Sequence, residues 1–241
     1  MGCLICSAEP TVKSHIIPRA LFHAMKRDGH QLVGGRGDGP GYRVLQAGDW
    51  DDRLLCSRHE AALGEADRYG VAFCLEAKRQ SDMGKHYYDV ANPRPDLLVA
   101  FASACVWRYA ASRSNGRPER ALGPYAGKIQ RALFEQGDFS PFLLVSRHAY
   151  EIEPGQIMNM GVLPHLYHEE GIRFWRFIVL GLIFDLKLDN RATPPPMAIL
   201  GVNDQNLIRL SDDFPQKVMR VPGFARSLIR LATPPGKGRP G

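Results

Sequence analysis

The chain has 241 residues and a formal net charge of +6, with 44% hydrophobic and 23% charged residues, as is usual for a globular protein. No apolar run reaches the roughly 18–20 residues that a membrane-spanning helix needs, and the N-terminus lacks the basic and apolar segments of a signal peptide. We therefore expect a cytoplasmic protein with no membrane partner, long enough for one large domain or two small ones.

The cysteine pattern indicates metal ligation. An odd number of cysteines that includes a Cys-x-x-Cys pair favours metal ligation in a reducing compartment over a disulfide framework. The later cysteines stand among apolar residues, which predicts buried core thiols. The five cysteines are Cys3, Cys6, Cys56, Cys74 and Cys105.

The first 80 residues predict a metal-binding knuckle followed by helices. Residues 1–18 form the knuckle and a short extended segment, which Pro18 ends. A short helix is expected over Arg19–Arg27, with Leu21, Phe22 and Met25 on its apolar side. The glycines of 34–41 predict a flexible loop, and the next four residues, Tyr42–Leu45, read as a strand.

Helices dominate the middle of the chain. The first spans about Ser57–Gln80 and is weakened by Gly64 and Gly70, so a break within it is expected. After a linker over 85–95 comes a buried helix over Leu97–Ser112, capped by Asp96. A further helix over Tyr125–Gln136 follows Pro124.

Strand patterns replace helical ones after residue 140. Apolar runs over Phe142–Val145, Ile157–Leu163 and Arg173–Leu188 predict strands, with a bulge or bend at Gly181, and a further short strand is expected at 198–202. The fold class is therefore α+β, with central helices and a mostly antiparallel C-terminal sheet. We divide the chain into a metal module over 1–80, a helical and sheet region over 81–213, and a tail over 214–241.

The tail carries the whole excess of positive charge. It contains six basic residues and no acid from Lys217 onward, so the remaining 25 Lys and Arg balance the 25 Asp and Glu before it. Such a tail suits a phosphate-rich partner, and a purely solvated tail explains it equally well. The tail residues expected to contact nucleic acid are Lys217, Arg220, Arg226 and Arg230, the last two within a predicted short basic helix over 221–232.

Two pairs of ligand residues predict a zinc site. Cys3 and Cys6 can reach one ion from a tight turn, and Cys56 and His59 can complete a tetrahedron from the start of a helix. Four protein ligands make the zinc structural, because they leave no open coordination position for water. The alternative is that His59 is a surface histidine and another group closes the site.

Three segments resemble the HNH endonuclease superfamily, which has a ββα-metal fold and a treble-clef zinc knuckle. The resemblance covers residues 1 to about 65. The matching segments are Cys3-x-x-Cys6, Ser14-His15-Ile-Ile-Pro18 and Asp52-Arg-Leu-Leu-Cys56-x-x-His59-Glu60.

The resemblance implies a metal-dependent nuclease acting on DNA. His15 would be the general base that takes a proton from the attacking water, a role that suits an imidazole near neutral pH. A catalytic Mg²⁺ or Mn²⁺ would be held by Glu60 and Asp52, because Ser14 stands where the family has an aspartate. His15 as a structural histidine or a zinc ligand is the alternative role.

Basic residues around the module are candidates for gripping phosphates. A mixed solvated surface is the alternative, because acids are interspersed. The candidates are Arg19, Lys26, Arg27, Arg36, Arg43, Arg53 and Arg58.

Other polar and aromatic groups have simpler interpretations. Glu65 and Asp67 read as solvated helix charges, and His165 and His168 as residues of a loop rather than a metal pair. Trp107-Arg108-Tyr109 and Trp175-Arg176-Phe177 favour core packing over base stacking.

Two other classes of function stay open. A module that has lost its catalytic metal would keep the zinc and bind nucleic acid or a protein partner without cutting. A purely structural interaction protein would use the sheet as its docking face.

Overall fold

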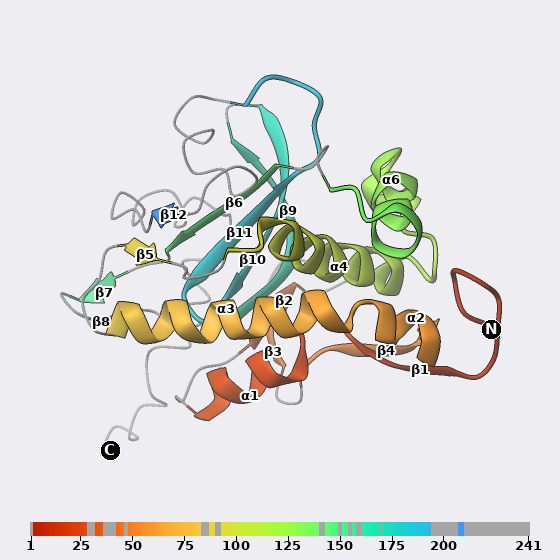
Figure 1. Ribbon diagram of the computed structural model, residues 1–241, viewed down its shortest axis with the longest axis horizontal. Helices are drawn as coiled ribbons and strands as arrows, with labels where there is room; N and C mark the ends of the chain where they lie inside the picture. The colour runs from red at the N-terminus through yellow and green to blue at the C-terminus, as the bar shows by residue number, and fades with distance from the viewer. Residues whose placement is uncertain are drawn as a thin grey trace, which may run out of the picture.

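A computed structural model describes residues 2–27, 32–35, 42–45, 48–82, 87–89, 93–139, 143–148, 151–153, 156–157, 161–169, 171–193 and 207–209. Helices and mostly antiparallel strands confirm the α+β class. In Figure 1 helices α3 and α4 run across one face of the large sheet, and the N-terminal segment lies at one end of α3.

The N-terminal part is built on an antiparallel strand pair. Strand β1 (Thr11–His15) pairs with β4 (Trp50–Cys56), so that Thr11 lies opposite Cys56 and His15 opposite Trp50. Helix α1 (Arg19–Arg27) begins directly after Pro18 and confirms the predicted bounds. Its period of 3.6 residues buries Leu21, Phe22, Ala24 and Met25 and leaves its basic side chains exposed.

The long helix predicted after Cys56 is broken in two. Helix α2 (Ser57–Ala62) ends at Leu63, and α3 (Gly64–Asp82) then continues through Gly70. Continuity at Gly70 has a packing reason: a Cβ there would lie 2.3 Å from the ring of Phe101, so only glycine lets α4 approach this closely.

Helix α4 (Pro95–Arg113) is the central helix of the molecule. It is apolar all round and is buried between α3 and the sheet. The predicted cap is wrong: the N-cap residue is Arg94, because Pro95 already starts the helix, and Asp96 lies in the first turn paired with the Arg94 guanidinium at 2.7 Å.

One six-stranded sheet has the order β3-β2-β9-β10-β11-β6. All its neighbours are antiparallel except β2 and β9, which are parallel. The strands are β2 (Leu32–Gly35), β3 (Tyr42–Leu45), β6 (Leu143–His148), β9 (Gly161–Glu169), β10 (Ile172–Val179) and β11 (Leu182–Lys187). Two strands from the predicted metal module thus extend the sheet that was expected only from the C-terminal half.

Several strand predictions needed correction. Gly34 and Gly35 belong to β2 rather than to the predicted loop. The expected strand over 157–163 divides between β8 (Gln156–Ile157) and β9. Gly181 marks a hairpin turn between β10 and β11, where Leu180 and Gly181 both have positive φ (49° and 79°), as turns that match the strand twist require.

The remaining elements are short. Strand β5 (Tyr87–Asp89), in the segment predicted as a linker, pairs with β12 (Leu207–Arg209), and β7 (Glu151–Glu153) pairs with β8. After α5 (Glu119–Leu122), the predicted helix over 125–136 divides into α6 (Tyr125–Arg131) and a π-helical turn over Ala132–Gln136. The segments 198–202 and 214–241, including the basic tail, lie outside the described residues.

One hydrophobic core joins helices and sheet. Phe101 contacts Phe177 and Phe184 at ring-centroid distances of 6.0 and 5.7 Å. Phe73 contacts Phe184 at 6.5 Å, so the core includes residues on both sides of residue 80, the predicted end of the metal module. Cys74 and Cys105 are fully buried in this core, as predicted. Among the described residues, no helix is long and apolar enough to cross a membrane.

The contact at Gly70 gives a direct test of this packing. Gly70→Ala should lower the free energy of unfolding by about 1–3 kcal/mol, because the added methyl group overlaps the Phe101 ring and α3 and α4 must separate. Urea unfolding of both proteins measures the difference.

The matched control is Gly127→Ala in α6, where the added Cβ would meet only the end of the Arg131 side chain at 3.6 Å. That change should raise stability by about 0.5–1 kcal/mol through helix propensity. Equal effects of the two substitutions would contradict the close approach at Gly70.

Candidate metal centre and the polar cluster beside it

A tight turn presents the first two cysteines. The backbone N–H of Ser7 donates to the Cys3 carbonyl at 2.7 Å, and that of Cys3 donates to the Ala8 carbonyl at 2.9 Å. Ser7 adopts a positive φ of 60° to close the turn. The Leu4 N–H donates to the Leu54 carbonyl at 2.9 Å, which fixes the turn against the end of β4.

The second pair comes from the junction of strand and helix. Cys56 is the last residue of β4 and the N-cap of α2, with an extended backbone, and His59 lies one turn later. A strand that changes directly into a helix therefore brings both side chains to the same end of α2. Because Cys56 pairs with Thr11, the register of β1 and β4 also fixes where this strand–helix junction lies relative to the N-terminal turn.

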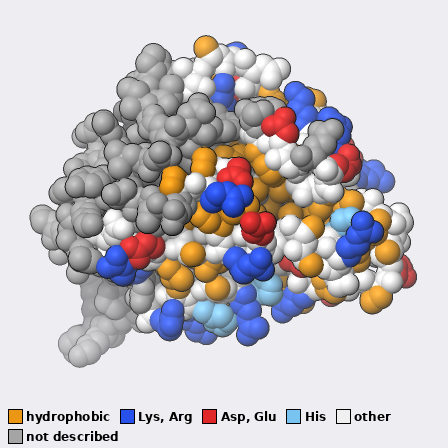
Figure 2. All heavy atoms as spheres, viewed as in Figure 1, with side chains coloured by type: hydrophobic (Ala, Val, Ile, Leu, Met, Phe, Trp, Pro, Cys, Tyr) orange, Lys and Arg blue, Asp and Glu red, His pale blue; other side chains and the backbone are white. Residues whose placement is uncertain are grey.

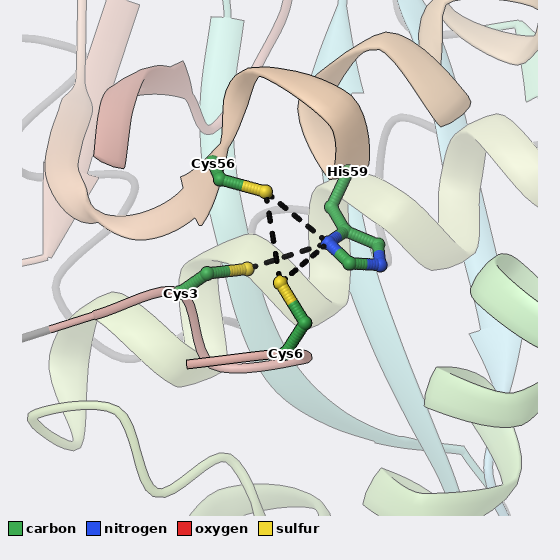
Figure 3. Close-up of side chains that lie close together, drawn as sticks. All are labelled: Cys3, Cys6, Cys56 and His59. Carbon is green, nitrogen blue, oxygen red and sulfur yellow. Dashed lines mark hydrogen bonds between the residues drawn. The ribbon is translucent and has the colours of Figure 1, made fainter. Parts of the chain in front are cut away.

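The four predicted ligands converge. Figure 3 shows the three sulfurs and the His59 ring pointing toward one another. The His59 Nδ1 lies 3.5, 3.5 and 3.3 Å from the sulfurs of Cys3, Cys6 and Cys56, and the sulfurs of Cys6 and Cys56 are 3.8 Å apart. All four donor atoms lie within 4.8 Å of one another.

These spacings suit a tetrahedral ion. Zinc bonds of about 2.3 Å to sulfur and about 2.05 Å to nitrogen would place two sulfurs about 3.8 Å apart and a sulfur about 3.5 Å from a nitrogen. The four side chains could therefore hold a metal such as zinc.

The thiol pKa values indicate that this cluster favours a cation. Burial opposes ionisation of Cys3, but hydrogen bonds from the backbone of Cys56, Ile5 and Cys6 prevail and lower its pKa to about 6. At Cys6 a backbone hydrogen bond at Ala8 lowers the pKa, whereas burial and the neighbouring thiols raise it, and the net shift is upward. Ionisation of one thiol thus disfavours ionisation of the next, unless a bound positive ion compensates the negative charge.

A charged cluster lies beside the metal site. Arg108 of α4 is 1% exposed and donates to Asp67 at 2.8 and 3.1 Å and to Glu60 at 3.2 Å. The Ser14 hydroxyl of β1 donates to the other Glu60 oxygen. Burial by itself would lower the pKa of Arg108, but the Asp67 and Glu60 carboxylates raise it overall, so the guanidinium stays charged.

This cluster corrects the interpretation of Asp67. Asp67 is not a freely solvated helix charge, because burying the Arg108 guanidinium requires a carboxylate partner. The aromatic neighbours of the two arginine motifs pack in the core as expected: Trp107 is fully buried, and Trp175 is 6% exposed. Base stacking on either tryptophan is thereby excluded.

His15 is half-buried at the end of β1. Burial lowers its pKa first, and the positive charges of Lys13, Arg19, Arg108 and His23 lower it further. The lowered pKa favours the neutral imidazole, the form that can accept a proton. These four charged residues belong to β1, α1 and α4, so three elements contribute to the positive potential at His15.

The two candidate oxygen ligands are not brought together. Glu60 lies next to Ser14 and Arg108, whereas Asp52 is exposed and contributes its backbone carbonyl to the Thr11 hydroxyl at 2.6 Å. The aspartate opposite Ser14 is Asp51, which is buried and bound by the Arg53 guanidinium and the Ser112 hydroxyl.

The other predicted residues divide between surface and sheet. Arg19 and Arg58 are exposed, and Arg53 pairs with Asp51 at 2.9 Å. His165 and His168 lie in strand β9 rather than in a loop, opposite Arg176 and Arg173. The tail candidates Lys217, Arg220, Arg226 and Arg230 lie outside the described residues.

Three residues near His15 were not predicted from the sequence as part of the site: Lys13, Arg108 and Trp50. The positive charges of Lys13 and Arg108 lower the pKa of His15, and Trp50 is paired with His15 across β1 and β4. The position of Lys13, two residues before His15, was the one signal in the sequence that could have indicated these neighbours. Comparisons with protein family models, with curated proteins and with solved structures found no match for this chain.

Metal content tests the cluster. Purified protein should contain one tightly bound metal ion per chain, and Cys6→Ser should lose most of it because a hydroxyl replaces a thiolate ligand. Elemental analysis by mass spectrometry measures the ratio. Cys74→Ala, which changes a buried cysteine outside the cluster, is the control and should keep the ion. Equal metal content in both variants would rule out the cluster as the site.

Removing the buried guanidinium should be costly. Arg108→Met leaves Glu60 and Asp67 without their shared cation and should lower the free energy of unfolding by about 3–5 kcal/mol. Urea unfolding of the metal-loaded protein measures the loss.

The control for this loss is Arg94→Met, which removes an exposed arginine also paired with an aspartate. Its unfolding midpoint should stay near that of the wild type, because solvent screens the pair. A small loss in both variants would mean that Arg108 is not essential to the packing around β1.

Proposed function

We propose that this protein is a nuclease that hydrolyses phosphodiester bonds of DNA, with a structural zinc ion next to its active centre. The observation that carries the proposal is His15: a half-buried imidazole with a lowered pKa, surrounded by positive side chains. A base that is neutral and a surface that attracts phosphate are both needed at such a centre.

Zinc is the proposed occupant of the four-residue cluster. Three thiolates and one imidazole form a donor set that zinc prefers, at separations that fit its tetrahedron. Bound there, the ion would hold the N-terminal turn, the end of β4 and α2 together and perform no chemistry, because all four positions are filled by the protein. The order of two antiparallel strands followed by a helix supports the HNH-like, treble-clef interpretation.

The proposed chemistry uses residues of this chain. The neutral His15 accepts the proton from a water molecule as the water attacks phosphorus. The P–O bond to the leaving sugar oxygen breaks, and that oxygen takes a proton from solvent. Lys13 and Arg19 offset the growing negative charge on the phosphate oxygens. Ser14 is held by Glu60, and Glu60 by Arg108, so the strand that carries His15 is tied to α2 and α4.

The residues expected from the resemblance to bind a catalytic divalent ion fit that role less well than the four-residue cluster fits zinc. Both Glu60 oxygens already accept hydrogen bonds, from Ser14 and from Arg108, and Asp52 lies elsewhere. An Mg²⁺ or Mn²⁺ ion at Glu60 would have to displace one of these donors, so we assign no step to it. Dependence on such an ion stays a prediction.

The second candidate is a zinc module that binds nucleic acid or a protein partner without cutting. The position of Arg108 favours it, because a buried guanidinium already compensates the carboxylate that would otherwise serve as an oxygen ligand. Binding without hydrolysis by zinc-loaded protein would select this candidate over the nuclease.

The pH dependence of cleavage tests the proposed base. With plasmid DNA, kcat/KM should fall as pH decreases through a pKa below the usual value of about 6.5, because burial and nearby cations disfavour the imidazolium and keep the base neutral to lower pH. His15→Ala should reduce the rate on the order of 10²–10⁴-fold and remove this limb of the profile.

His168→Ala is the matched control, because this exposed histidine of β9 is not among the charges that act on His15 and its loss should leave the shape of the profile intact. Zinc content and unfolding midpoint should be unchanged in both variants. A His15→Ala protein that cleaves at the wild-type rate would refute the proposed role.

A further inference from the structure

The exposed side of α1 is entirely basic or small. Arg19, His23, Lys26 and Arg27 lie at spacings that place them on one side of the helix, and all four are exposed. α1 contains no acidic residue. With Ala20, the last three line a shallow hollow, and Figure 2 shows Lys, Arg and His side chains gathered along the lower edge where α1 lies.

This basic face continues to the candidate active centre. Arg19 and His23 are among the charges that lower the pKa of His15, so their potential reaches its ring. The potential that disfavours a proton on His15 equally favours a phosphate beside it. The basic side of α1 thus begins four residues after His15 in the chain, with Arg19 donating to His23 at 2.9 Å.

An exposed tryptophan lies at the same place. Trp50 is 42% exposed, whereas Trp107 and Trp175 are buried. It pairs with His15 across β1 and β4, which places the two side chains about 5 Å apart at their Cβ atoms on one face of the strands. The Lys13 ammonium lies 3.8 Å from the centre of its ring.

This combination differs from what duplex binding requires. A duplex keeps its bases stacked inside and offers phosphates to basic side chains, so it would use α1 but have no use for an exposed indole. An unpaired base can stack on an aromatic ring while its phosphates follow a basic track, and stacking accepts any base. Exposing an indole to water is otherwise unfavourable.

We propose that Trp50, Lys13 and the basic face of α1 form a docking surface for single-stranded nucleic acid, with an unpaired base on Trp50 and the adjoining phosphate at His15. The proposal names the substrate class of the nuclease centre and rests on that centre for its biological meaning. Binding itself does not depend on hydrolysis, so the two can fail separately.

The experiment measures binding by the full-length, zinc-loaded protein to fluorescent phosphorothioate oligonucleotides, which resist cleavage. Anisotropy should show tighter binding to a mixed-sequence single strand than to the same sequence as a duplex. Single-strand binding should also quench Trp50 fluorescence, which is readable because the other two tryptophans are buried.

Substitutions separate stacking from charge. Trp50→Leu should weaken single-strand binding on the order of tenfold and leave duplex binding unchanged, and Trp50→Phe should keep most of the affinity. Lys26→Glu with Arg27→Glu should weaken both substrates and reduce the salt dependence of binding. Leu166→Ala, at another exposed apolar residue, and Arg120→Glu, an exposed arginine of α5, are controls without effect.

Several outcomes would overturn the inference. Equal affinity for single strand and duplex together with no effect of Trp50→Leu would exclude stacking. Equal binding of polyglutamate or of anionic lipid vesicles would show a surface for another class of partner. Tight single-strand binding without cleavage of ordinary oligonucleotides would sustain the docking surface and reject the proposed nuclease.

Discussion

Four side chains from two distant parts of the chain meet at one point, beside the strand pair that carries His15. Cys3 and Cys6 belong to an N-terminal turn, and Cys56 and His59 to the start of α2, some fifty residues later. Between them, β1 and β4 are paired over only a few residues with an irregularity near Lys13. A strand pair this short is marginal by itself, so a shared ion would supply the constraint that the backbone lacks.

The second constraint is electrostatic and comes from outside the metal module. Arg108 projects from the central helix and is shared by Glu60 of α2 and Asp67 of α3, while Glu60 also receives the Ser14 hydroxyl of β1. Four elements thus meet around one buried charge. Such a cluster contributes specificity of arrangement more than net stability, because burying a guanidinium is itself costly. The strand that carries His15 is therefore positioned from two sides.

The sequence predicted local features well and long-range ones poorly. Helix α1 and the four ligand residues were predictable because they depend on short spacings: a helical period after Pro18, and ligand pairs two residues apart. The Gly70 contact and the Arg108 cluster were not predictable, because each depends on which distant side chain packs alongside. Asp67 reads as a surface residue in the sequence and becomes the partner of a buried guanidinium only when α4 lies across α3. Trp50 likewise gains meaning only from its pairing with His15.

The segment between β1 and β4 contributes more than a connection. It supplies β2 and β3, which lie outside β9 in the sheet order, with β2 forming the single parallel contact of that sheet. β2 pairs with Gly161 and Val162 and so covers the hydrogen-bonding groups at the start of β9, a strand that also exposes Leu166. A chain shortened between its two ligand pairs would keep the metal site and bare an edge open to pairing with another molecule. Cover for this part of the sheet edge is thus supplied by the predicted metal module rather than by the C-terminal half of the chain.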